Sequence, residues 1–138
     1  MTEERRCPCG SDSLYAACCG LYIDGGQRPD TAERLMRSRY TAYTLKREPY
    51  LLRTWHASTR PGELGLGKDG ATKWLGLEII RAEAGGAGDA QGIVEFVARY
   101  NVNGKAGRLH EVSRFTRENG QWFYVDGEVP PPVKKPAR

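Results

Sequence analysis

All four cysteines of this chain lie close together near its start, in two pairs. They are Cys7, Cys9, Cys18 and Cys19. Thiolates are preferred zinc ligands, and four of them complete a tetrahedral shell. Gly10 permits a tight turn after the first pair. Ser11 is placed to cap a short helical turn that would return the second pair to the first. The pattern predicts one zinc site.

Disulfide bonds are the alternative use of these thiols. Adjacent cysteines such as Cys18 and Cys19 bond to each other only with strain, and bridges between the two pairs would close short loops. The first six residues are charged and lack the apolar core of a signal peptide, so we expect a cytoplasmic protein. In that compartment a cysteine cluster more often binds metal. We therefore favour a closed, structural zinc site, with Arg5 and Arg6 offsetting the charge of its thiolates.

Catalytic groups are scarce elsewhere. His56 and His110 are the only histidines. His110 precedes Glu111 on a predicted strand, so the two side chains point to opposite faces and cannot act together. The strand face that carries Glu111 is more apolar than the face that carries His110. We therefore expect Glu111 on the inward face. No nucleophile elbow, phosphate-binding glycine loop or pair of carboxylates at helical spacing is present, so a binding protein is favoured over an enzyme.

The charge of the chain argues against nucleic acid and membrane as partners. Its 138 residues carry a formal charge of +4, and the basic excess lies in residues 30–60 and in the C-terminal tail. A surplus this small is typical of a solvated helix face rather than of a nucleic-acid interface. No apolar run approaches the ~20 residues that cross a bilayer.

A long helix is predicted from Asp30 to about Arg47, with Asp30 as its N-cap because Glu33 completes a capping box. Its apolar positions recur at three- and four-residue steps and form one stripe. They are Ala32, Leu35, Met36, Tyr40 and Tyr43. Arg39 shares this inward face, so its guanidinium needs an acceptor inside the domain. A short second helix is predicted over residues 50–55, after a break near Pro49.

Four strands follow, predicted over residues 74–81, 93–100, 109–117 and 121–126, with a hairpin turn at Asn103–Gly104. Short connections indicate an antiparallel meander. Helices followed by a curved antiparallel sheet define an α+β fold with the long helix covering one sheet face. We divide the chain into a zinc motif with its linker (1–28), a cone-shaped α+β domain (29–128) and a disordered tail rich in proline and lysine (129–138).

The cysteine stretch, CPCGS followed by a tyrosine and CCG, resembles the SEC-C motif, the zinc-binding tail of the preprotein translocase ATPase SecA. The run from Pro29 to Tyr43 and the later Thr54-Trp55-His56 extend the match. This longer pattern is similar to the YchJ family of small bacterial proteins, in which a SEC-C motif is fused to a nuclear-transport-factor-2-like (NTF2-like) domain. The resemblance implies zinc and a cone-shaped fold, and it carries no assigned reaction. Some members have a second cysteine motif at the C-terminus, which this chain lacks.

Two functional hypotheses follow. The first is a zinc-bearing module that binds a protein partner and is attached to a small cone domain. The alternative is a small-molecule-binding protein or enzyme that uses the interior of the cone. For that interior we expect Arg39 to pair with Glu111 at the floor, with Tyr43 and Trp55 as walls and His56 as a further candidate. The pair is either an internal structural contact, which we favour, or a polar anchor for an anionic or carbonyl-bearing ligand.

Overall fold

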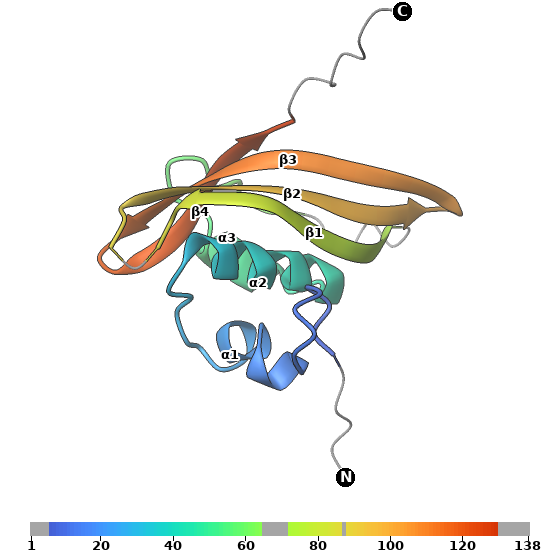
Figure 1. Cartoon of the computed structure of the whole chain (residues 1–138), viewed down its shortest axis with the longest axis horizontal. Helices are drawn as coiled ribbons and strands as arrows, with labels where there is room; N and C mark the ends of the chain where they lie inside the picture. Colours follow the sequence, from blue (N-terminus) through green and yellow to red (C-terminus); the bar gives the residue numbers. More distant parts are fainter. Residues whose placement is uncertain (1–5, 65–71, 87, 130–138) are drawn as a thin grey trace, which may run out of the picture.

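A four-stranded sheet lies over two helices, and the N-terminal segment lies beneath the longer of them (Figure 1). The computed structural model describes residues 6–64, 72–86 and 88–129. The tail prediction for residues 130–138 therefore falls outside the described residues. The elements are η1 (Tyr15–Ala17), α1 (Gly20–Ile23), α2 (Ala32–Leu45), α3 (Glu48–Arg53), β1 (Thr72–Ala84), β2 (Gln91–Val102), β3 (Lys105–Glu118) and β4 (Gln121–Glu128).

The sheet is the predicted antiparallel meander, in the order β1-β2-β3-β4. Asn103 and Gly104 turn β2 into β3, and Asn119 and Gly120 turn β3 into β4. All four have positive φ angles, between 52° and 87°, which is the requirement of a tight two-residue hairpin turn. Register shifts interrupt β1 twice and β3–β4 once, and such bulges bend a strand. The sheet therefore curves over α2, as the cone prediction required.

Helix α2 is capped by Thr31, so the prediction of Asp30 was wrong. Thr31 has extended backbone angles, and its Oγ1 accepts a hydrogen bond from the Arg34 amide at 3.1 Å. Asp30 instead makes an exposed ion pair with the Arg34 side chain at 3.4 Å. The Thr31 hydroxyl accepts a hydrogen bond from a backbone amide of the first turn that has no partner within the helix. An N-cap needs only this one bond, so the acidic residue of a capping box is not required.

Helix α2 is buried on two sides rather than one. Leu35 and Ala32, both in the predicted apolar stripe, are buried. Ser38 and Thr41 lie off that stripe and are also fully buried. The Ser38 hydroxyl is satisfied by the Leu35 carbonyl at 2.8 Å and the Tyr50 hydroxyl at 2.6 Å. The second buried side exists because the N-terminal segment packs on the helix face that the sheet leaves uncovered.

That segment, residues 6–28, is called the cysteine module below. Residues 21–28 were predicted as a linker, but α1 occupies their first part, and Tyr22 and Ile23 join the hydrophobic core. Ser11 caps no helix, because η1 follows Leu14 and has no side-chain cap. The module and the cone therefore share one core, which also includes Cys7, Cys9 and Cys19.

Helix α3 begins before Pro49 rather than after it, because proline is tolerated in the first helical turn, where its missing N–H has no partner to lose. Among the described residues, none of the helices combines the length and hydropathy that a bilayer crossing demands.

Candidate functional site

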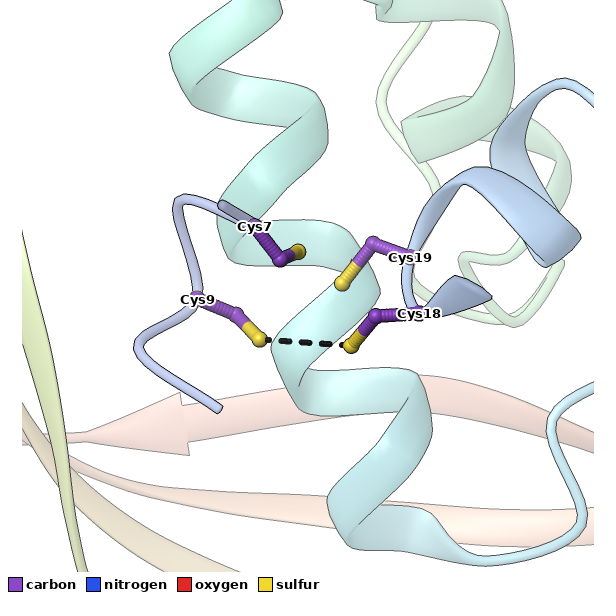
Figure 2. Close-up of side chains that lie close together, drawn as sticks. All are labelled: Cys7, Cys9, Cys18 and Cys19. Atoms are coloured by element: carbon purple, nitrogen blue, oxygen red, sulfur yellow. Dashed lines mark hydrogen bonds between the residues drawn. The ribbon is translucent and has the colours of Figure 1, made fainter. Parts of the chain in front are cut away.

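The four cysteine sulfurs converge on one point (Figure 2). All four lie within 4.8 Å of one another, and Cys9 Sγ and Cys18 Sγ are 3.7 Å apart. Four sulfurs at ~2.3 Å from a tetrahedral zinc ion would lie about 3.8 Å from one another. None of the four forms a disulfide. The sulfur arrangement therefore has the size and the donor set of a four-thiolate metal site, and the disulfide alternative is not adopted.

Two local structures hold the pairs in place. The Cys7 amide donates to the Ser13 carbonyl at 2.8 Å, and the Gly10 amide donates to the Cys7 carbonyl at 3.2 Å. Gly10 has a φ of 82°, so glycine is required at this turn. Cys19 has helical angles at the start of α1, whereas Cys18 has φ −129° and ψ −111°. This change of backbone direction allows two adjacent side chains to point to the same centre.

Helix α2 supplies two polar groups to the cluster. Arg37 donates from Nη1 to the Cys9 carbonyl at 2.9 Å and lies 3.9 Å from Cys9 Sγ. Thr41 donates to Cys19 Sγ at 3.2 Å, and its hydroxyl is 3.7 Å from Cys7 Sγ. A partly buried cation and a buried hydroxyl beside sulfur both favour the thiolate form. Helix α2 is therefore part of the site.

Arg37 takes the place that the sequence analysis gave to Arg6. The Arg6 guanidinium donates to the Asp12 carbonyl at 2.6 Å and pairs with the Asp12 carboxylate at 3.7 Å, on the exposed surface. Arg5 lies outside the described residues. Sequence reasoning missed Arg37 and Thr41 because they lie far from the cysteines along the chain. Their four-residue spacing, on the helix side away from the apolar stripe, was the only signal.

The thiols do not hold their protons equally. Hydrogen bonds from Cys19 and Cys7 lower the pKa of the Cys9 thiol. The Cys19 thiol acts as a donor to Cys7 and Cys9, and this role, together with burial, raises its pKa. Burial also raises the pKa of Cys18. A bound cation must therefore displace protons from Cys18 and Cys19, which makes metal affinity fall as the pH falls.

A second candidate site lies between α2 and the sheet. This cavity, the cone pocket, has a volume of about 240 Å³. The residues that line it include Arg39, Tyr43, Trp74, Phe96, Glu111 and Tyr124. Arg39, Tyr43 and Glu111 were predicted for this interior, and the structure brings these three together. Trp55 and His56 are not among the lining residues.

The predicted pair of Arg39 with Glu111 is wrong. Arg39 is buried, and its Nη1 donates to the Leu51 carbonyl and to Thr54 Oγ1, both at 2.8 Å. Its guanidinium carbon lies 4.5 Å from the ring centroid of Tyr124 and 5.0 Å from that of Trp55. Two acceptors from the α3 segment and two aromatic faces therefore stabilise this cation without an ion pair to an acid.

Glu111 lies on the inward face of β3, as the strand alternation predicted. Its Oε2 accepts hydrogen bonds from Ser113 at 2.7 Å and from Tyr124 at 3.3 Å. His110 points to the opposite face and bonds Glu95 at 2.6 Å.

His56 lies outside the cone pocket. It bonds Glu118 at 2.8 Å and Ser58 at 2.7 Å. Neither histidine of the chain is placed to act as a base in the cone pocket.

The fold and the cysteine cluster together define a class: an NTF2-like α+β domain with a SEC-C-type module packed on its long helix. A family model described as "YchJ, middle NTF2-like domain" matches residues 31–127, and the chain belongs to the YchJ family. A UPF0225 protein of Chromobacterium violaceum is 59% identical over 125 residues, which are 89% of this chain and 92% of that relative. One from Methylibium petroleiphilum is 50% identical over 127 residues, covering 92% and 90% of the two chains.

Solved structures agree with this placement. The solution structure of a SEC-C motif containing protein from Rhodopseudomonas palustris superimposes with a TM-score of 0.81 at 30% identity and covers 91% of this chain and 98% of that chain. The crystal structure of a SEC-C motif containing protein from Psychrobacter arcticus gives a TM-score of 0.71 at 29% identity, with coverages of 93% and 84%.

Proposed function

We propose that this protein binds one structural zinc ion through Cys7, Cys9, Cys18 and Cys19. The observation that carries the proposal is the convergence of four sulfurs within 4.8 Å, three of them on buried residues. Zinc would cross-link the two halves of the cysteine module and neutralise its thiolates. Because four protein ligands leave no open position for water, the role of the metal is structural.

Metal analysis of protein purified under reducing, chelator-free conditions tests this proposal. The expected result is one zinc per chain, with loss of tight binding in each single cysteine-to-serine variant. Ser13→Ala is the matched control, because Ser13 lies in the same module and contributes its backbone carbonyl rather than its side chain. Well under one zinc per chain in the parent would overturn the proposal. Full affinity in Cys19→Ser alone would remove Cys19 from the ligand set.

We further propose that the zinc-loaded module contacts a protein partner in the cytoplasm. The supporting feature is a groove of about 510 Å³ beside Cys18, which is the most exposed of the four cysteines. Its lining is mainly polar and includes Ser11, Ser13, Arg34 and Arg37. Such a lining suits a polypeptide with carboxylates and carbonyl groups, and its few cations do not form the extended basic stripe that binds nucleic acid.

Affinity capture with the zinc-loaded full chain tests the groove. Arg34→Glu should abolish capture of a specific partner, because the exposed Arg34 guanidinium lies in the groove. Arg108→Glu, at an exposed position of β3, is the charge-matched control that should leave capture intact. Capture that depends on added nucleic acid, or that survives Arg34→Glu, would refute this proposal.

A second candidate function is small-molecule binding in the cone pocket. One observation favours it: a buried guanidinium, that of Arg39, lines the cavity and uses only one of its three nitrogens within the protein. A guanidinium with a purely structural role would be expected to use all three nitrogens, since each buried donor left without a partner costs free energy.

A further inference from the structure

Arg39 presents an unused edge to the cone pocket. Its Nη1 makes both of its hydrogen bonds, and no described residue lies within hydrogen-bonding distance of Nε or Nη2. Among the described residues, every fully buried side-chain nitrogen or oxygen has a partner, so these two nitrogens keep some exposure, and Arg39 is one of the residues that line the cavity. The Nε–Nη2 edge carries two parallel N–H groups. That edge is the one that binds a planar carboxylate through two hydrogen bonds.

Glu111 presents an unused acceptor to the same cavity. Its Oε2 takes the hydrogen bonds of Ser113 and Tyr124, whereas Oε1 accepts none from the described residues. Arg39 and Glu111 form no ion pair, because no nitrogen–oxygen distance between them is 4.0 Å or less. A positive and a negative group therefore face one cavity while remaining separate. A ligand that neutralises both must carry an anion and a cationic donor.

The rest of the cone pocket is apolar and aromatic. Tyr40 and Trp74 meet edge to face with centroids 6.1 Å apart, and Phe96 and Leu109 complete this part of the lining. Aromatic walls of this kind bury a flat or branched apolar group. A cavity of about 240 Å³ accommodates a group of the size of a single amino-acid side chain together with its polar end.

We propose that the cone pocket binds a free α-amino acid with an apolar or aromatic side chain. Its carboxylate occupies the Nε–Nη2 edge of Arg39, its ammonium donates to Glu111, and its side chain lies against Trp74 and Phe96. This inference rests on small-molecule binding, the second function proposed above, and is independent of the zinc proposal. It names a ligand class from charge complementarity: a plain carboxylate would be repelled by Glu111, and a plain amine would be repelled by Arg39.

Titration of the zinc-loaded, ¹⁵N-labelled full chain tests the inference by NMR. The probes are L-phenylalanine, phenylacetate, 2-phenylethylamine and N-acetyl-L-phenylalanine, which differ in the groups offered to Arg39 and Glu111. L-phenylalanine should shift the Trp74 indole and Arg39 Nε resonances. The other three probes should bind at least about tenfold more weakly, because each leaves one buried charge without its partner.

Variants separate recognition from folding. Glu111→Gln keeps the shape of the side chain and should weaken L-phenylalanine binding by about tenfold or more, while phenylacetate should bind more tightly because the charge that repels its carboxylate is gone. Arg39→Lys keeps the charge, removes the two-pronged edge and should weaken both. His110→Gln, on the opposite face of the same strand, is the control and should change neither.

The outcomes of this titration distinguish a failure of the amino-acid proposal from a failure of small-molecule binding as such. Phenylacetate or 2-phenylethylamine binding in the cone pocket as tightly as L-phenylalanine would overturn the amino-acid class and leave small-molecule binding standing. N-acetyl-L-phenylalanine binding equally well would show that a peptide C-terminus is recognised and would also overturn the proposal. If none of the four probes shifts the cavity resonances at millimolar concentration, both the class and the small-molecule function fall.

Discussion

Replacing Thr41 with valine should weaken zinc binding without removing any ligand. Thr41 is fully buried on α2, and its hydroxyl donates to Cys19 Sγ at 3.2 Å. Valine keeps the shape of the side chain and loses the donor. A hydrogen bond to a charged acceptor contributes ~1.5–3 kcal/mol, and each ~1.4 kcal/mol is a factor of ten in affinity. We therefore expect zinc affinity to fall by about ten- to a hundredfold, the range found for groups that orient metal ligands.

Competition with a chromophoric chelator measures this affinity, and thermal unfolding of the loaded and metal-free forms locates the effect. The loaded form should lose more stability than the metal-free form, because the hydroxyl stabilises the thiolate rather than the thiol. Thr44→Val is the matched control on the same helix, since the Thr44 hydroxyl donates to the Tyr40 carbonyl instead. Unchanged zinc affinity in Thr41→Val, or equal losses in the two forms, would refute the assignment of Thr41 to the site.

Three further predictions concern the cone domain. Arg39→Met should lower the free energy of unfolding by on the order of 2–4 kcal/mol. Adding Glu111→Leu should recover none of this loss, since the two residues form no ion pair. Recovery in a double-mutant cycle would contradict the structure. Burial raises the pKa of Tyr50 from 10.0 to about 12, so the unfolded chain loses this proton first, and urea unfolding should show stability falling between pH 10 and 12. Tyr50→Phe should make this decrease smaller, and an unchanged decrease in that variant would contradict the assignment to Tyr50. Thr31→Ala should cost about 1 kcal/mol and Asp30→Ala less than half of that, and equal losses would restore Asp30 as the cap.

Patterns that depend on neighbours along the chain predicted most of the fold. The strand alternation around Glu111 and the Asn103–Gly104 turn are local signals, and the meander follows from them. The strands extend past the predicted ends because backbone pairing continues through polar residues once the central register is set. The burial of Ser38 and Thr41 could not be predicted, because it depends on the cysteine module packing against α2.

The cysteine cluster was predictable because all four cysteines lie close together in the sequence. The groups that favour the thiolate form of these cysteines were not predictable, since Arg37 and Thr41 reach the sulfurs only through tertiary packing. The Arg39 partner was missed for a different reason. One of its acceptors is the main-chain carbonyl of Leu51, and a carbonyl has no residue-type signal. The other acceptor, Thr54 Oγ1, is an uncharged side-chain hydroxyl, and the acid Glu111 was chosen in its place, which was wrong.

Helix α2 contributes residues to both candidate sites. Arg37 and Thr41 face the cysteines, while Arg39 and Tyr43 face the cone pocket. These residues alternate within two turns of one helix, so neither compartment can shift α2 without shifting the other. Thermodynamic linkage then imposes a reciprocal relation. Any free energy by which zinc favours the binding-competent position of α2 must reappear, equal in size, as an increase in zinc affinity when the pocket is filled. Zinc and a pocket ligand, bound as proposed, would then raise each other's affinity to the extent that both favour the same position of α2.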